Sequence, residues 1–128
     1  LATSAPAVFK ALVEATAFGS RAINERMLEE GVPIDNIIAI GGIARKSSVV
    51  MRTMADVMGM PIRVLDSDQA CALGAAMFAA VAAGVHGSVA EAQRAMRPGF
   101  SDEYRPDMER HAIYDYLYAR YLKLGAAR

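Results

Sequence analysis

The sequence predicts an α/β fold with a short, mostly parallel sheet and packed helices. Ile37–Ile40 is an apolar, β-branched run bounded by Asp35 and by a glycine pair, which indicates a buried strand. Ser48–Met58 then carries apolar residues at helical spacing, and Ile62–Leu65 is a second short strand. A strand, a helix and a strand in this order form a βαβ unit. We therefore expect two parallel strands, in a mixed or parallel sheet that is covered on both faces.

The remaining elements that we expect are helices, all within one domain that spans residues 1–128. The first helix has Ser4 at its start and Gly31 at its stop. Ser88 and Glu91 form a capping box that begins a later helix. The expected ranges are helix 5–30, strand 37–40, helix 48–58, strand 62–65, helix 69–83, helix 89–96 and helix 108–124. We expect Phe100–Pro106, between the last two helices, to be an irregular surface link.

Three features of these helices concern burial. Helix 108–124 carries a stripe of large side chains at helical spacing, which we expect to pack in the core rather than to stack bases or meet a membrane. The stripe consists of Tyr114, Leu117, Tyr118, Tyr121 and Leu122. Helix 69–83 is rich in alanine, so we expect its backbone to approach a neighbour closely around Gly74, and Cys71 to be small and buried. Glu14 and Arg21 either face a ligand cleft or, as we favour, form a solvated face or an intrahelical pair.

The amino-acid composition argues against some classes of binding partner and indicates a cellular compartment. The 14 basic residues balance the 14 acidic ones, so neither nucleic acid nor an acidic membrane is expected as a partner. One cysteine excludes an internal disulfide framework and fits a reducing compartment, with the cytoplasm as the default. Two histidines without a cysteine partner argue against zinc, and Asp66–Asp68 is expected to be a turn and helix cap rather than a metal site. Because the chain opens at Leu1 without a basic leader and has one domain's length, we expect it to be a piece of a longer protein.

The glycine pair after the first strand is the strongest candidate for a functional site. Gly41 and Gly42 lack a Cβ, so they can adopt positive φ and allow a flat ring or a phosphate to approach the main chain. Ser47 or Ser48 then caps the following helix. This arrangement is typical of a nucleotide site, although a plain turn between a strand and a helix is an alternative that the dipeptide alone favours.

A longer stretch of the sequence favours the nucleotide site over the plain turn. The sequence GGIARKSSVVMRTMADVMGMPIRVLDSDQACALGAAMFAAVAAG, from Gly41 to Gly84, closely resembles the C-terminal nucleotide-binding domain of the FGGY carbohydrate kinases, most of all those that phosphorylate ketopentoses. A weaker resemblance covers Ala11–Glu25 and the tyrosine-rich tail. In that family the glycine pair belongs to the adenosine motif, and the helix with Ala72–Ala76 connects two lobes. The resemblance implies a partial actin-like, RNase H-like nucleotide-binding lobe.

The same resemblance implies the chemistry. FGGY kinases transfer the γ-phosphoryl group of ATP, with Mg, to a sugar hydroxyl, and they use an Asp as general base. This chain contains no Asp-x-Gly-(Ser/Thr) phosphate loop, so we assign it no catalytic and no metal-binding residue and expect the absent N-terminal portion to hold the base, the sugar site and most of the Mg contacts. The expected adenosine contacts are Gly41, Gly42, Ile43 and Ala44. The next three residues, Arg45, Lys46 and Ser47, are expected at the edge of this site, which we call its lip.

The lip leaves two alternatives open. Lys46 stands about where some family members have an asparagine, so its cation could meet the α-phosphate, or Arg45 and Lys46 could be a solvated pair. The partners that we expect in the complete enzyme are a ketopentose such as L-ribulose and the N-terminal lobe, and a homodimer is left open. We expect the isolated chain to be inactive. The alternative function is a non-catalytic nucleotide-binding or interaction module of the actin-like superfamily.

Overall fold

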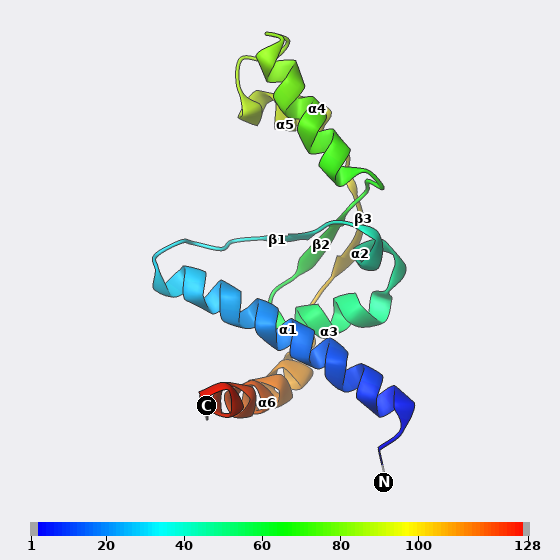
Figure 1. The fold of residues 1–128 in the computed structure, drawn as a ribbon, viewed down its shortest axis with the longest axis vertical. Helices are drawn as coiled ribbons and strands as arrows, with labels where there is room; N and C mark the ends of the chain where they lie inside the picture. Colours follow the sequence, from blue (N-terminus) through cyan, green and yellow to red (C-terminus); the bar gives the residue numbers. More distant parts are fainter. Residues whose placement is uncertain (1–2, 127–128) are drawn as a thin grey trace.

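The computed structural model describes residues 3–126, and a small mixed sheet lies at its centre (Figure 1). Strands β1 (Ile37–Ala39) and β2 (Ile62–Leu65) pair in parallel, with Ile37 opposite Ile62. Helix α3 (Ser48–Met58) connects them and packs on one face of the sheet. The predicted βαβ unit is therefore present.

Strand β3 (Phe100–Tyr104) corrects the expectation of an irregular link over Phe100–Pro106. It pairs antiparallel with β2, with Ile62 opposite Tyr104, and gives the sheet order β1-β2-β3. The sequence FSDEY has apolar residues only at its two ends, so it carries no alternation that predicts a strand. The segment becomes a strand because the second edge of β2 offers its unpaired backbone groups.

Three helices form a layer on one side of the sheet. Helix α1 (Ala5–Glu29) crosses α3, and α6 (Met108–Ala126) packs on α3 as well (Figure 1). One core cluster joins these helices, and a second joins α3 to the sheet. The first contains Ala17, Phe18, Val57, Tyr114 and Tyr118, and the second contains Ala44, Met51, Ala55, Ile62 and Val64.

The tyrosine stripe is buried only along half of its length. Tyr114 and Tyr118 lie in the first core cluster with Phe18, as predicted. Tyr121 and Leu122 are exposed in the described chain, which contradicts the expectation for that end of α6. Tyr121 still contributes to the core, because its ring centroid lies 5.5 Å from that of Phe18.

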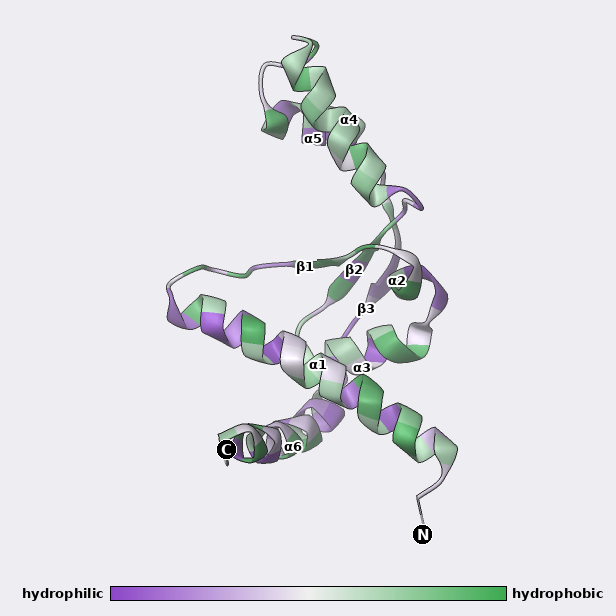
Figure 2. Ribbon diagram, in the orientation of Figure 1, coloured by the Kyte–Doolittle hydropathy of each residue, from purple (hydrophilic) through white to green (hydrophobic). Residues whose placement is uncertain are grey.

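A helical hairpin projects away from the other elements. It consists of α4 (Ala70–Ala82) and α5 (Val89–Met96), which pack on each other (Figure 1). Figure 2 colours α4 as hydrophobic along most of its length, yet Met77 is its one buried residue within the described part of the chain. Cys71 is exposed, and outside the backbone of α4 itself a Cβ added at Gly74 would meet no atom of the described residues within 4 Å. The expected burial of Cys71 and the close approach at Gly74 are therefore wrong for these residues.

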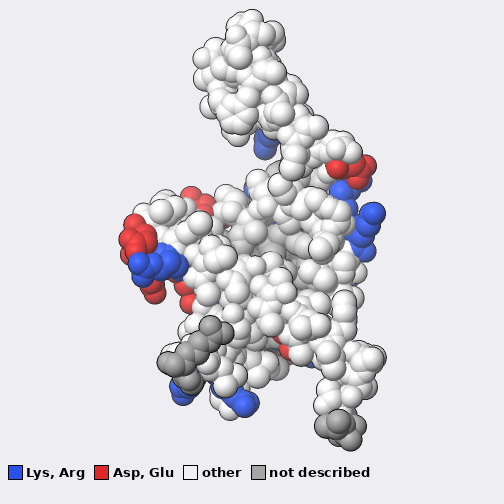
Figure 3. Space-filling view, viewed as in Figure 1, with Lys and Arg blue, Asp and Glu red and all other residues white. Residues whose placement is uncertain are grey.

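The sheet has only one fully covered face. Ile62 and Val64 point toward α3 and are almost completely buried, whereas Ile38 and Ile40 are about half exposed. The expectation of cover on both faces is thus wrong for residues 3–126. Figure 3 shows charged side chains scattered over the rest of this view, while the surface of the hairpin at the top is almost free of them. Within residues 3–126, no helix combines the length and the apolarity needed to cross a membrane.

Candidate nucleotide-binding turn

The glycine pair lies directly after β1, at the start of the short helix α2 (Gly42–Lys46). Gly41 has φ +91°, a conformation that residues with a Cβ rarely adopt. Apart from its chain neighbours and the backbone of its own helix, Gly42 has no atom of the described residues within 4 Å of the position that a Cβ would occupy. The main chain at Gly42 is therefore open on the side where a side chain would stand, which is the geometry that a ligand in contact with the backbone requires.

The next two residues point in opposite directions. Ala44 is buried among Met51 and Ala55 and fixes α2 to the core. Ile43 is 69% exposed, so its side chain is free to cover one side of a bound ring. These two side chains define the orientation of α2, because that of Ala44 is buried in the core and that of Ile43 faces outward. Only the backbone of Ala44 remains for a ligand contact.

The residues at the lip differ in how they are held. The Arg45 guanidinium donates a hydrogen bond to Asp68 and lies 3.5 Å from Asp66. Lys46 is exposed and makes no ion pair with any residue of the 3–126 range. Ser47 is the N-cap of α3, and its hydroxyl accepts a hydrogen bond from the Val50 amide at 3.4 Å. The prediction that Ser47 or Ser48 caps this helix is confirmed for Ser47.

The acidic turn Asp66–Asp68 follows β2, the parallel neighbour of β1. The carboxyl ends of parallel strands lie at the same edge of a sheet, which is where ligands bind in open α/β folds. The Ser67 hydroxyl accepts from the Gln69 amide at 3.2 Å, so the expected turn is present. The expected helix cap is wrong, because the N-cap of α4 is Gln69 and no side chain makes a capping bond there. The role of this turn as the partner of Arg45 was missed in the sequence. The available signal was a basic residue after one parallel strand and acidic residues after the next.

An apolar cavity of about 400 Å³ lies beside the turn, between the open face of the sheet and the hairpin. Ile40, the residue before Gly41, lines it together with Leu65 of β2 and Met77 of α4. Its wall is mostly apolar, with Gln93 and Arg97 as polar members. This cavity and the glycine turn therefore share one edge of the sheet.

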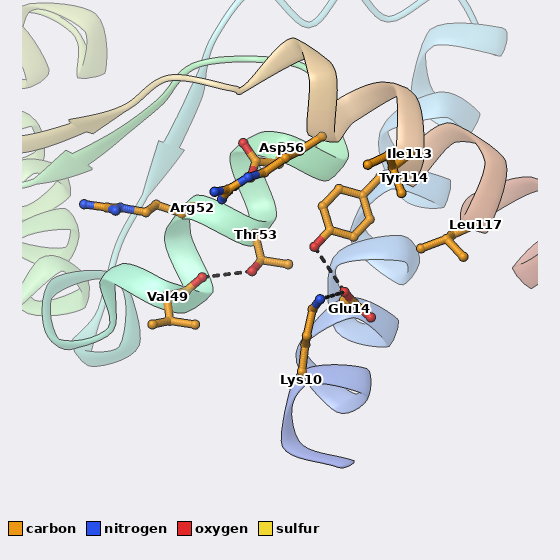
Figure 4. Close-up of a pocket in the computed structure, with 10 residues that line it drawn as sticks. Lys10, Glu14, Val49, Arg52, Thr53, Asp56, Ile113, Tyr114 and Leu117 are labelled. Carbon is orange, nitrogen blue, oxygen red and sulfur yellow. Dashed lines mark hydrogen bonds and ion pairs between the residues drawn. The ribbon is translucent and has the colours of Figure 1, made fainter. Parts of the chain in front are cut away.

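A second cavity, of about 530 Å³, lies between α1, α3 and α6 (Figure 4). Here Glu14 accepts a hydrogen bond from the Tyr114 hydroxyl at 3.1 Å and pairs with Lys10 at 3.5 Å. Burial, together with this bond to Glu14, raises the pKa of Tyr114 to about 12. Asp56 is buried and accepts from the Asp107 amide at 2.8 Å, which fixes the start of α6. These polar groups hold the helices together.

Arg21 has the same structural role further along α1. It pairs with Glu25 on its own helix at 2.8 Å, and it donates to the Val57 carbonyl at 3.2 Å and to Asp115 at 2.6 Å. Arg21–Glu25 and Lys10–Glu14 are intrahelical pairs, which agrees with one of the two alternatives that we favoured for Arg21 and Glu14, although the sequence did not name their partners. The contacts of Glu14 and Arg21 with α6 were not predicted. The glycine turn is built without either residue.

Comparison with known proteins agrees with this architecture. Residues 1–83 match the model of the FGGY family of carbohydrate kinases, C-terminal domain. The ribulokinase of Vibrio parahaemolyticus is 48% identical over 125 residues, which cover 98% of this chain and 22% of the relative. The ribulokinase of Bacillus licheniformis is 43% identical over 128 residues, covering 97% and 23%. The chain thus spans less than a quarter of the length of these relatives.

The solved structures that resemble this chain include sugar kinases as well. The xylulose kinase from Rhodospirillum rubrum superposes with a TM-score of 0.81 and 29% identity, over 98% of this chain and 25% of that one. A Brucella ovis structure described as a xyloylose kinase gives 0.82 and 26%, over 94% and 24%. The α/β, actin-like lobe is therefore confirmed, and the chain belongs to the FGGY family of carbohydrate kinases as a ribulokinase-like part of the C-terminal domain.

Proposed function

We propose that this chain supplies the adenosine-binding side of an ATP-dependent sugar kinase that phosphorylates a ketopentose such as L-ribulose. The observation that carries the proposal is the glycine turn, where Gly41 has positive φ and the backbone of Gly42 is open at the carboxyl edge of the parallel strands. The ribulokinase relatives support the choice of substrate class. They are kinases, so they do not favour the alternative of a non-catalytic module.

Within this proposal the seven turn residues divide by role. The backbone of Gly41, Gly42 and Ala44 lies against the adenosine, and the exposed side chain of Ile43 covers one side of it. Lys46 is the cation at the lip that can meet the α-phosphate, because it is exposed and makes no ion pair in the described part of the chain. The roles of Ser47 and Arg45 are to cap α3 and to hold the turn.

The remaining parts of the reaction belong, in this proposal, to the rest of the protein. Phosphoryl transfer needs a general base near the acceptor hydroxyl and a site for Mg and the terminal phosphates. We assign these to the N-terminal lobe, together with the sugar site. ATP then lies between that lobe and the glycine turn, and the isolated chain has no activity. We place the complete enzyme in the cytoplasm, and leave a homodimer as an option.

Gly42→Val in the full-length kinase tests the adenosine site. A branched side chain then occupies the open space at Gly42, and we expect the KM for ATP to rise about tenfold or more, equivalent to about 1.4 kcal/mol of binding free energy. The matched control is Gly125→Val on α6, another helical glycine for which no atom of residues 3–126, its chain neighbours and own helix backbone aside, lies within 4 Å of the position that a Cβ would occupy. A folded Gly42→Val enzyme with unchanged ATP affinity would show that the adenosine lies elsewhere.

A further inference from the structure

We infer that Arg45 is a positioning residue, which with Asp66 and Asp68 forms a clamp that holds the glycine turn in the shape that receives adenosine. The inference rests on the proposed function of that turn. The clamp joins α2, which follows β1, to the acidic turn that follows β2. Arg45 is the less exposed member of this pair, because its side chain is 29% exposed and that of Asp68 is 82% exposed.

The glycine turn needs such an attachment. Gly41 and Gly42 restrict the backbone less than any other residues, and a helix of five residues has little stability of its own. On its inner side α2 is fixed by the buried side chain of Ala44. On its outer side Arg45 makes the one side-chain hydrogen bond that joins α2 to the rest of the described chain, at Asp68 of the acidic turn.

The acidic turn is itself well fixed. The Asp66 amide donates a hydrogen bond to the Gly99 carbonyl at 3.0 Å, and the Gln69 amide donates to the Ser67 hydroxyl at 3.2 Å. The first bond ties the turn to the segment just before β3, and the second ties it to the start of α4. Arg45 therefore connects the glycine turn, whose two glycines restrict the backbone little, to an acidic turn that hydrogen bonds fix at both of its ends.

The clamp also decides which cation is available to phosphate. Two carboxylates beside one guanidinium give the cluster a net negative charge, which repels an incoming phosphate. Lys46 is the neighbouring basic residue and has no carboxylate partner among residues 3–126. The phosphate contact therefore belongs to Lys46, and Arg45 acts through the shape of the turn.

The competing role, with Arg45 as a direct phosphate ligand, makes the opposite prediction for its partner. If Asp68 only competes with phosphate for Arg45, Asp68→Asn frees the guanidinium and strengthens nucleotide binding. If Asp68 is half of the clamp, Asp68→Asn loosens the turn and weakens binding. The sign of one measurement thus distinguishes the two roles.

The experiment measures dissociation constants by calorimetry for ADP and for adenosine, in the full-length kinase with Arg45→Gln, Asp68→Asn and both together. We expect each single variant to weaken both ligands equally, by about 3- to 10-fold, because a loosened turn is competent for only a fraction of the time. The double variant should be no weaker than either single variant, since the clamp is already lost. The kcat should change less than about twofold, and Arg45→Lys should restore part of the affinity.

Two controls accompany these variants. Lys46→Gln should weaken ADP but not adenosine, because it removes a phosphate contact alone. Glu103→Gln breaks another exposed pair, to Arg105 at 2.7 Å, and should change neither ligand. Unchanged or tighter binding by Asp68→Asn would overturn the clamp. If Gly42→Val weakens ATP binding in the same enzyme, the proposed function stands without the clamp, whereas if it does not, the adenosine site itself is wrong.

Discussion

Tyr118 of α6 is the side chain whose removal should test the core most directly. It is 4% exposed, and its ring centroid lies 5.8 Å from that of Phe18 and 6.2 Å from that of Tyr121. The Arg21 guanidinium carbon lies 4.4 Å from the ring centroid. The hydroxyl donates to Glu25 at 2.8 Å. Tyr118 therefore joins α6 to α1 by packing, by a cation–π contact and by a hydrogen bond.

These contacts set the expected loss for Tyr118→Ala. Truncation of a large aromatic side chain in a core costs about 3–5 kcal/mol. The cation–π contact with Arg21 adds about 0.5–1 kcal/mol. Tyr118→Phe keeps the ring and loses the bond to Glu25, which remains paired with Arg21, so that we expect a loss of about 1 kcal/mol.

Guanidinium unfolding of the 128-residue chain, followed by circular dichroism, measures both variants. The matched control is Tyr116→Ala on the same helix, which is 66% exposed and should change the free energy of unfolding by less than about 0.5 kcal/mol. A loss near zero for Tyr118→Ala would refute the assignment of α6 to the core of this domain. The helix would then serve an interface with a part of the protein outside this chain.

Two further predictions concern alkaline pH and activity. Burial, then bonds to Glu14 and Glu25 respectively, raise the pKa of Tyr114 and of Tyr118 from 10 to about 12, so the unfolded chain loses these protons first. Stability should be fully present below pH 10 and fall as pH rises toward 12, and the two Tyr→Phe variants should flatten this fall in denaturant titrations. Secondly, the isolated chain with MgATP and L-ribulose, D-ribulose, xylulose or glycerol should release no sugar-dependent ADP. Turnover of about 1–100 per second, as in ordinary kinases, would contradict the division of roles between the lobes.

The sequence predicted those elements whose signals are local. The run Ile37–Ile40 and the cap at Ser47 were recognised because β-branched side chains and a capping hydroxyl act within a few residues. Phe100–Tyr104 was missed because its pairing with β2 depends on a neighbour more than thirty residues away along the chain. The alanine-rich α4 was expected to be buried, since hydropathy reports what a helix can pack against and not whether a partner lies within the same chain.

In the candidate site, too, the local features could be predicted from the sequence and the contacts between distant residues could not. The glycine pair, the positive φ at Gly41 and the capped helix after it could be predicted from residue types alone, whereas Gly42, which could also have adopted positive φ, is helical instead. The pairing of Arg45 with Asp68 could not, because it depends on the parallel alignment of two strands. The bonds from Tyr114 and Tyr118 to α1 likewise depend on how two helices cross.

The way in which the hairpin of α4 and α5 leaves the sheet bears on how this protein can be altered. Leu65 and Phe100, on either side of it, are register partners in the sheet, and the bond from the Asp66 amide to the Gly99 carbonyl closes its base. The two ends of the excursion therefore stand next to each other, independently of what lies between them. Such a junction is a graft point, where a segment of another length could replace the helices while β2 and β3 keep their alignment.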